Sequence, residues 1–333
     1  MTFGNETGDA SSCIIEFPSK GWLFDAMAAV SPTASAGIVT QVVGCTLPQF
    51  GELAHADVAA FAAATEQLGV DSLWVADRLL APVDPTALHA GMRGAIPEHY
   101  RTIADPLIAL TVAATVTTTV RLGASVLVGP WYPPVQLARQ LTTIDAVSDG
   151  RLLPGFGVGW SPDEYCASGA RFEDRGALLD ELLDVLIALW TTSPVEHQGV
   201  HWSIPPSWVD FKPVQRPRPP IGLGAFTGAG LRRVGERADC WLPVVWASNH
   251  VDLSPLHAQR NAVDAAARAV GRDSAEITAQ VRVNVAPGTP LVAVADTTRR
   301  LADNGYPDSF VELMWAVEDI DSQLEWIAKF AAL

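Results

Sequence analysis

The stretch RLLPGFGVGWSPDEY, residues 151–165, carries the strongest fold signal in the chain. It begins as an apolar strand at Leu152–Leu153 and continues through Gly155, Gly157 and Gly159, which are spaced two residues apart. In a strand, this spacing puts all three glycines on one face. A strand face without side chains suits a place where a flat or bulky group approaches the backbone, and tight packing in a barrel wall is the alternative.

A helix start follows the glycines directly. Ser161 is expected to be the N-cap, Pro162 the first helical residue, and Ser161 with Glu164 a capping box. The strand therefore runs into a helix whose free backbone N–H groups point at whatever occupies the glycine face.

Strand and helix patterns alternate on both sides of this stretch. Expected strands cover residues 42–50, 72–77, 121–128, 152–159, 219–225, 240–245, 277–285 and 309–315, and expected helices 57–69, 105–119, 134–147, 175–191, 227–237, 255–270, 290–304 and 320–332. Alternation predicts an α/β protein with parallel strands and crossover helices. Eight such units are the number in a (β/α)8 TIM-like barrel, and a doubly wound open sheet is the alternative.

Three segments fall outside this alternation. Residues 1–41 are expected to be an irregular N-terminal extension, and residues 42–333 the barrel domain. Residues 78–104 form a loop rich in proline and glycine, and loops of that length are commonly functional. Residues 194–219 hold six prolines and are expected to be an insertion.

Composition excludes several classes of partner. The net charge of −15 and the pI of about 4.8 argue against nucleic acid and anionic membranes. No apolar run of 18 residues predicts a membrane span, and the first 40 residues lack a secretory signal pattern, so a cytoplasmic location is expected.

The cysteine and histidine spacings do not predict a metal site. Cys13, Cys45, Cys166 and Cys240 have no C-x-x-C spacing and are expected to be free thiols. His197 and His201 are separated by a glycine, and no H-E-x-x-H motif is present. The other histidines considered are expected to be solvated rather than catalytic: His89, His99, His250 and His257.

Ligands of a (β/α)8 barrel bind where the strands end at their C-termini. The expected strand ends are Pro48–Gln49, Asp77–Arg78, Val126–Pro130, Gly157–Trp160, Gly224–Thr227, Val245–Ser248, Asn284–Val285 and Met314–Trp315. The carboxylate of Asp77 is read as functional, with a salt bridge or helix cap as the alternative. Ser125–Val126 is read as plain strand, with a bulge as the alternative. The turn in residues 221–230 suits a phosphate, although an ordinary turn is equally compatible.

The chain from about Val43 to Leu333 resembles the bacterial luciferase-like monooxygenase superfamily and, within it, the coenzyme F420-dependent oxidoreductases. The resemblance is carried by TLPQFG (46–51), SLWVADR (72–78), RLGASVLV (121–128), PVQLARQLTTIDAVSDGRLLPGFGVGW (134–160), PDEY (162–165) and PPIGLGAFTGAGLRRVGERADCWLPV (219–244). It implies a TIM-like barrel with an insertion over the active site.

The resemblance implies roles for two pairs of residues. Asp77 matches a residue beside the deazaflavin or flavin ring. Arg78 stands where the family often has a histidine, which is catalytic in some members. Ser125 and Val126 match a non-prolyl cis peptide that backs the cofactor ring.

Further positions are implied to lie along the cofactor. Gly157, Val158 and Gly159 match the loop beside its ribityl and phosphate groups. Trp160 falls where sugar-phosphate dehydrogenases carry a glutamate acid, which disfavours that substrate class. The phosphate-holding loop is matched by Gly224, Ala225, Phe226 and Thr227.

These expectations lead to an F420-dependent oxidoreductase that transfers a hydride between C5 of the cofactor and an organic, apolar substrate. Asp77 and Arg78 are the expected catalytic residues, and no metal is expected. An FMN-dependent monooxygenase and a non-catalytic flavin-binding barrel are the alternatives. A homodimer is expected, with an F420- or flavin-reducing enzyme as an indirect partner.

Overall fold

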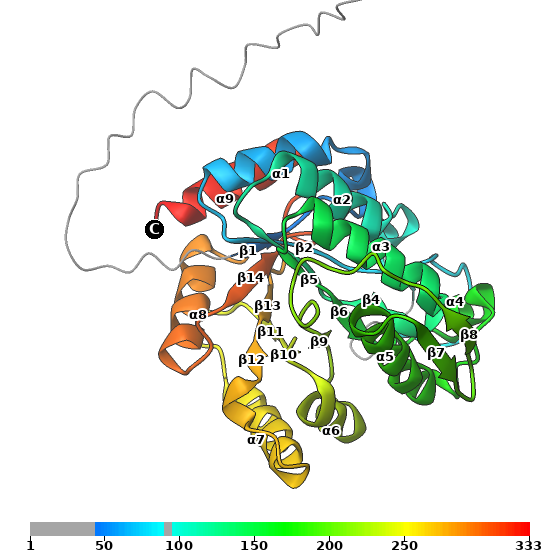
Figure 1. Ribbon diagram of the computed structural model, residues 1–333. Helices are drawn as coiled ribbons and strands as arrows, with labels where there is room; N and C mark the ends of the chain where they lie inside the picture. The colour runs from blue at the N-terminus through cyan, green and yellow to red at the C-terminus, as the bar shows by residue number, and fades with distance from the viewer. Residues whose placement is uncertain (1–43, 90–94) are drawn as a thin grey trace, which may run out of the picture. The chain divides into compact units, whose positions relative to one another are not determined.

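Short parallel strands alternate with helices along the chain, and the helices lie around the outside of the strands (Figure 1). The computed structural model describes residues 44–89 and 95–333. The expected extension at residues 1–41 lies outside this part. The strands are β1 (Gly44–Thr46), β2 (Ser72–Val75), β3 (Arg121–Ala124), β4 (Leu127–Val128), β5 (Leu152–Leu153), β6 (Gly155–Gly157), β9 (Gly222–Leu223), β10 (Cys240–Trp241), β11 (Val244–Trp246), β12 (Thr278–Ala279), β13 (Val281–Asn284) and β14 (Ser309–Glu312).

The helices begin and end close to the positions expected from the sequence. They are α1 (Val58–Gln67), α2 (Pro106–Val116), α3 (Pro134–Val147), α4 (Pro162–Ser168), α5 (Arg175–Thr191), α6 (Gly228–Arg237), α7 (Ser254–Ala269), α8 (Leu291–Asp303) and α9 (Ile320–Ala331), with 3-10 turns at Gly51–His55, Glu98–Arg101 (η2), Gly129–Trp131 and Ser274–Glu276. Asp57 caps α1 by accepting a hydrogen bond from the backbone N–H of Ala60 at 3.0 Å.

The strand pairings follow the order of a (β/α)8 barrel. Parallel pairs join β1 to β2, β2 to β3 and β3 to β5, then β6 to β9, β9 to β10 and β10 to β12, and finally β13 to β14 and β14 to β1. Four expected strands are each divided into two short segments, as β3–β4, β5–β6, β10–β11 and β12–β13. The predicted fold class is thereby confirmed.

Large side chains from some strands and glycines from others fill the space between the strands. Trp74 of β2 stacks on Phe310 of β14, with ring centroids 4.3 Å apart. A Cβ atom on Gly123 would lie 2.3 Å from the Trp74 ring, so only glycine leaves room for that indole. Alternation of large and small inward residues is how a barrel of this size is packed.

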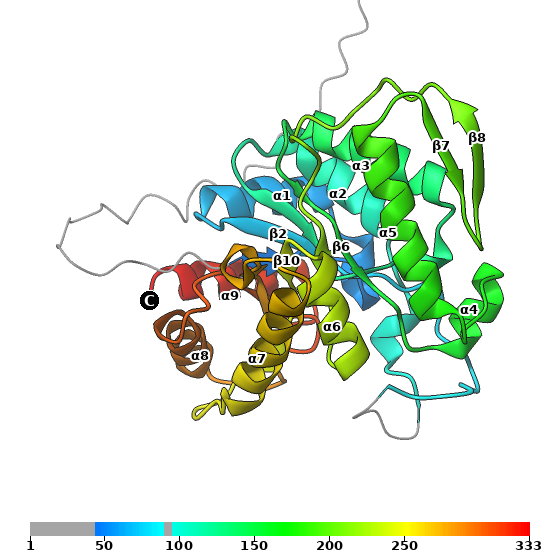
Figure 2. The same ribbon diagram turned by 60° about the horizontal axis from the view of Figure 1, so that its bottom comes forward.

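The proline-rich insertion forms an antiparallel hairpin, β7 (Val195–Gln198) and β8 (Ser203–Ser207), which lies beside α5 (Figure 2). The Glu181 carboxylate of α5 accepts hydrogen bonds from the backbone N–H groups of His201 and Trp202, and it lies 3.1 Å from Nε2 of His197. His197 is therefore paired with a carboxylate that also holds the hairpin turn.

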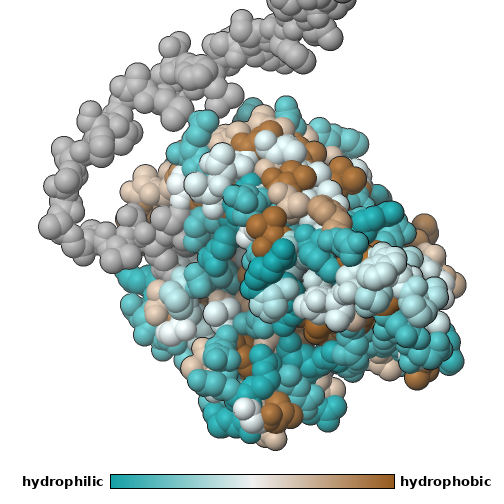
Figure 3. Space-filling view, in the orientation of Figure 1, coloured by the Kyte–Doolittle hydropathy of each residue, from teal (hydrophilic) through white to brown (hydrophobic). Residues whose placement is uncertain are grey.

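On the face shown in Figure 3, hydrophilic residues predominate and hydrophobic ones form separate patches. Cys45, Cys166 and Cys240 are free thiols, as expected, while Cys13 lies outside the described residues. Among the residues that the structure describes, none of the helices is long and apolar enough to span a membrane.

Candidate active site

Asp77 lies just beyond the end of β2 and is only 9% exposed. Its Oδ2 accepts hydrogen bonds from the backbone N–H of Val128 at 3.0 Å and from the Tyr132 hydroxyl at 2.9 Å. Burial raises the pKa of Asp77 to about 6, although these two hydrogen bonds act in the opposite direction. A carboxyl group that titrates near neutral pH, fixed at a strand end, is suited to contact a ligand.

The neighbouring Arg78 is buried and enclosed. Its Nη2 lies 2.9 Å from Oε2 of Glu164, and its Cζ lies 4.8 Å from the Tyr100 ring centroid and 4.6 Å from that of Trp160. Nε of Arg78 has no hydrogen-bond partner among the described residues. The guanidinium group is therefore held between two rings and neutralised by one carboxylate. The salt bridge that was the alternative reading for Asp77 is not formed among the described residues: the ion pair at this strand end joins Arg78 to Glu164 instead.

Glu164 corrects the expected capping box at the start of α4. Ser161 does cap the helix, because its Oγ accepts a hydrogen bond from the Glu164 N–H. The Glu164 side chain does not return to Ser161; it binds Arg78 and the backbone N–H of Leu79, at 2.8 Å. A buried guanidinium is a stronger partner for a carboxylate than a helix N-cap amide, which explains the difference.

The peptide bond between Ser125 and Val126 is cis, as the family resemblance implied, and the reading as plain strand is wrong here. The Val126 side chain lies against two glycines of neighbouring strands. A Cβ atom on Gly157 would lie 2.6 Å from Cγ2 of Val126, and one on Gly224 would lie 2.9 Å from Cγ1. These two glycines make room for one valine.

This packing corrects the idea of an open glycine face at residues 155–159. The Cβ position of Gly155 is 2.0 Å from the Ala124 carbonyl oxygen, and that of Gly159 is 2.7 Å from Cγ1 of Val128. Gly159 also has φ of +63°, which a residue with a side chain adopts only at a cost. The alternative of tight packing describes all three glycines. Contact of Gly157, Val158, Gly159 and Trp160 with a cofactor stays a prediction.

The second glycine-rich turn is open to solvent. Phe226 is 54% exposed, and Thr227 is the N-cap of α6 without a side-chain hydrogen bond to the first turn. The first backbone N–H groups of α6 are therefore available to a ligand, and such groups favour anions. Gly224 and Ala225 lie deeper, at the end of β9.

Sequence reasoning missed a second buried ion pair, between Arg282 of β13 and Glu312 of β14. Nη2 of Arg282 lies 2.8 Å from Oε2 of Glu312, and Nη1 donates to the carbonyl oxygen of Ser125 at 3.3 Å. Nε of Arg282 donates to Oδ1 of Asn284 at 2.9 Å. The available signal was a charged residue inside an apolar pattern on each of two neighbouring strands, VRVNV and FVEL.

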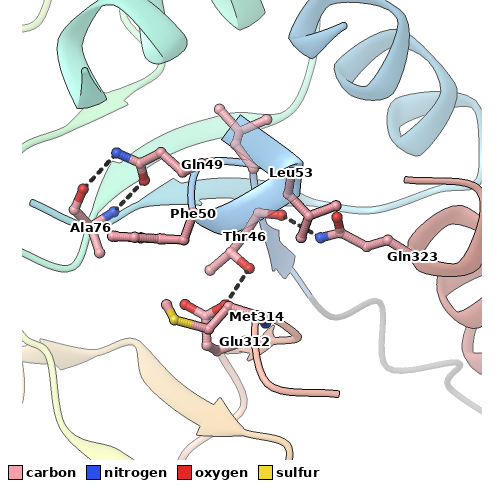
Figure 4. Close-up of a pocket in the computed structure, with 9 residues that line it drawn as sticks. Thr46, Gln49, Phe50, Leu53, Ala76, Glu312, Met314 and Gln323 are labelled. Atoms are coloured by element: carbon pink, nitrogen blue, oxygen red, sulfur yellow. Dashed lines mark hydrogen bonds between the residues drawn. The ribbon is translucent and has the colours of Figure 1, made fainter. Parts of the chain in front are cut away.

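Glu312 also borders a pocket at the ends of β1, β2 and β14 (Figure 4). Its Oε1 accepts hydrogen bonds from the Thr46 hydroxyl and the Met314 N–H, both at 3.0 Å. Across the pocket, the Gln49 amide is paired with the backbone of Ala76. The expected strand ends after β1, β2 and β14 therefore do meet.

Aromatic side chains cover this end of the barrel. The His99 ring lies between Tyr100, with centroids 4.5 Å apart, and Trp315, at 6.2 Å. Trp315 in turn contacts Trp246, at 5.1 Å. Burial lowers the pKa of His99, and its Nε2 is buried without a partner among the described residues. His99 was expected to be solvated; it is partly exposed, and its Nε2 is buried among these rings.

Comparison with known proteins identifies similar chains. Residues 35–306 match the family model described as luciferase-like monooxygenase. A Mycobacterium tuberculosis protein of uncharacterised function is 32% identical over 187 residues, which are 55% of this chain and 66% of that protein. An F420-dependent glucose-6-phosphate dehydrogenase of Amycolatopsis mediterranei is 30% identical over 176 residues, covering 52% of this chain and 47% of the enzyme.

A further relative is a flavin-dependent enzyme, and two solved structures of low sequence identity show similarity of fold only. The oxygenase component of a flavin-dependent trigonelline monooxygenase of Acinetobacter baylyi is 32% identical over 148 residues, 43% of this chain and 40% of that protein. The match thus spans about half the length of these two enzymes. Monooxygenase RslO1 of Streptomyces bottropensis has a TM-score of 0.66 at 18% identity, covering 87% of this chain and 97% of that one. An F420-dependent tetrahydromethanopterin reductase of Methanopyrus kandleri has a TM-score of 0.65 at 17% identity, covering 86% and 97%.

Proposed function

Because this chain belongs to the luciferase-like monooxygenase family, we propose that it is a coenzyme F420-dependent oxidoreductase. It would transfer a hydride between C5 of the deazaflavin and an organic, apolar substrate. The similarity to an F420-dependent dehydrogenase supports this choice of cofactor.

The proposal rests on one observation. A fixed acidic side chain lies just after the C-terminal end of one strand, and a helix N-terminus without a side-chain cap lies just after the C-terminal end of another. Asp77 is buried beyond β2 with its carboxyl group held by two donors. The N-terminus of α6, beyond β9, is exposed and uncapped. A cofactor with a flat ring and an anionic tail needs both kinds of contact, and a chain of net charge −15 must supply the second one locally.

The residues present fit such a cofactor in part. Asp77 would hold the ring, and Trp160 would line its edge. The backbone N–H groups at Thr227 and Gly228 would bind the phosphate. When bound, the cofactor supplies the hydride, while the protein orients the reactants and excludes water.

The substrate and partners belong to the same proposal. Trp246, which is 52% exposed, and the rings beside it offer an apolar surface for an organic substrate. The tryptophan at position 160 argues against a sugar phosphate. We further propose a cytoplasmic homodimer that depends on an F420- or flavin-reducing enzyme.

Cofactor titration tests the proposal. Purified protein is titrated with F420 and with FMN while fluorescence is followed, and saturable binding of F420 is expected. Thr227→Asp adds a negative charge at the α6 N-terminus and should weaken F420 binding at least about 10-fold, as a repulsion of about 1.4 kcal/mol would. Val147→Asp adds the same charge at the far end of α3 and should leave binding unchanged. Tight FMN binding with no response to F420 overturns the proposal.

An FMN-dependent monooxygenase is the second candidate, because one relative is a flavin-dependent monooxygenase. Oxygen consumption in the presence of a flavin reductase would favour it over F420 chemistry.

A non-catalytic flavin-binding barrel is the third candidate, because the charge of Arg78 is already neutralised by Glu164. Cofactor binding without turnover of any substrate in a broad panel would favour that reading.

A further inference from the structure

Tyr100 lies at the centre of the groups that cover the strand ends. It belongs to η2, in the segment that follows β2. The guanidinium of Arg78 faces its ring at 4.8 Å, and the ring makes edge contacts with Phe50 at 5.6 Å and His99 at 4.5 Å. Three neighbours therefore fix the orientation of this phenol.

The hydroxyl of Tyr100 is the one phenol oxygen without a partner among the described residues. The other three tyrosines of the chain are also described, and the hydroxyl of each has a partner: Tyr132 bonds Asp77, Tyr165 bonds the Val158 carbonyl, and Tyr306 contacts His257. The Tyr100 hydroxyl is also not among the buried unpartnered polar atoms. It therefore faces space that solvent or a ligand can reach.

Both buried ion pairs act on this hydroxyl. Burial raises the pKa of Tyr100, the charges of Arg282 and Arg78 lower it, and those of Glu312 and Glu164 raise it. The phenol is therefore protonated at neutral pH. The two guanidinium groups, which remain charged throughout the physiological range, offset part of the penalty that burial and the two carboxylates place on a phenolate there.

We propose that Tyr100 is the proton donor and acceptor of the reaction, because its ring lies against the strand-end residue Arg78 and its hydroxyl has no partner among the described residues. This inference rests on the proposed function. This role requires an organic carbonyl compound as substrate, or its alcohol in the reverse direction, and the bound cofactor would supply the hydride to the carbonyl carbon. The carbon–oxygen π bond breaks toward oxygen, and the Tyr100 O–H bond breaks as that oxygen takes the proton.

The atoms and charges of this step balance. The hydride that the cofactor would supply and the proton from Tyr100 together convert the carbonyl group into an alcohol, and the phenolate recovers a proton from water. In the oxidising direction, Tyr100 accepts the alcohol proton while the hydride leaves carbon. Arg78 cannot serve, because a guanidinium does not release its proton in proteins. Asp77 is held by Val128 and Tyr132 in the position proposed above for contact with the cofactor ring.

The first test needs no cofactor. Ultraviolet titration of the native chain minus that of Tyr100→Phe isolates the ionisation of the Tyr100 phenol. The pH midpoint of this ionisation is expected above that of free tyrosine. It should rise further in the double variant Arg282→Met/Glu312→Gln, which removes the guanidinium that lowers the pKa without leaving Glu312 as an unpaired buried charge. A Tyr100 midpoint that matches free tyrosine and does not respond to this double change overturns the inference.

The second test is kinetic. Tyr100→Phe should lower kcat by about 100-fold, the lower end of what a proton-transfer group contributes, with KM and F420 affinity changed less than about 3-fold. Tyr306→Phe removes the same atom at a site away from the strand ends and should be as active as the native chain. Native-like kcat in Tyr100→Phe with normal F420 binding overturns this inference alone. Failure of the native chain to bind F420 overturns the proposed function as well.

Discussion

Two buried arginine–carboxylate pairs cover the same end of the barrel, but they are built differently. Arg282 and Glu312 come from adjacent strands, whose register pairs Asn284 with Glu312. Arg78 and Glu164 come from segments 86 residues apart and meet outside the strands. In the strand pair, every nitrogen of the guanidinium has a protein partner, whereas Nε of Arg78 has none among the described residues.

The difference shows how similar chemistry can serve two purposes. The strand pair is held by backbone register and fixes the Ser125 carbonyl, so it acts as part of the framework. The outer pair is held by side chains and rings, and it also ties the start of α4 to Leu79. We therefore expect the strand pair to matter more for stability and the outer pair more for the arrangement of the site.

The largest expected effect is on the strand pair. Arg282→Met leaves Glu312, whose side chain is 2% exposed, as an uncompensated buried charge. The free energy of unfolding should fall by about 3–5 kcal/mol. Chemical denaturation measures this change. As the control, adding Glu312→Gln to Arg282→Met should restore much of the lost stability, because it removes the uncompensated charge. A loss below about 1 kcal/mol would mean that the two pairs do not differ as described.

The pH dependence of stability tests the surroundings of Asp77, which lies next to the outer pair. Burial is the main cause that raises the pKa of Asp77, and the charge of Glu164 raises it further. Its folded pKa, about 6, lies above its unfolded value, so its favourable contribution exists at low pH and is lost as the pH rises through 6. Asp77→Asn should therefore gain stability relative to the native chain between pH 4 and pH 7, by up to about 3 kcal/mol.

Denaturation of both chains at several pH values measures this effect. A constant difference between the two chains across this range would show that Asp77 titrates normally. The strand pair should not share this pH dependence, because Asp77 is not hydrogen-bonded to it.

A smaller loss is expected when the outer pair is broken. Glu164→Gln keeps a side-chain acceptor for the Leu79 N–H but removes the charge that faces Arg78. Unfolding free energy should fall by about 2–3 kcal/mol, less than for Arg282→Met, because glutamine keeps an acceptor oxygen and two aromatic rings still face the buried Arg78 guanidinium. Asp163→Asn, one residue away on the exposed side of α4, is the matched control. A loss larger than that of Arg282→Met would reverse the comparison.

The smallest effect concerns the rings. Arg78 faces two rings within 5 Å, while Arg282 faces one, that of Trp315, at 5.6 Å. Double-mutant cycles should give a coupling of about 1 kcal/mol between Arg78 and Trp160, and less between Arg282 and Trp315. Equal couplings would show that the aromatic enclosure of Arg78 has no energetic consequence.

Local signals in the sequence were read correctly where neighbours along the chain decide the outcome. Asp57 caps α1, Ser161 caps α4, and α3 has the bounds expected from its proline start and apolar spacing. The strand-end position of Asp77 followed from the alternation of elements. The resemblance supplied the cis peptide at Ser125–Val126, which the residues alone did not favour.

Predictions from the sequence were wrong where a side chain's partner lies far away along the chain. Glu164 has the sequence context of a capping box, but its side chain bonds a residue 86 positions away. The glycines at 155, 157 and 159 have the spacing of an open face, but the Ala124 carbonyl oxygen and the side chains of Val126 and Val128 occupy that space. Neither partner can be read from nearby sequence.

The sequence alone determined the order of strands and helices, because periodicity, caps and breakers act over a few residues. Only the tertiary structure decided which charges and rings meet, because strand register and loop packing set distances between residues far apart in the chain. The pair Arg282–Glu312 and the unpartnered hydroxyl of Tyr100 are of this second kind: each depends on segments that touch only once the barrel has formed.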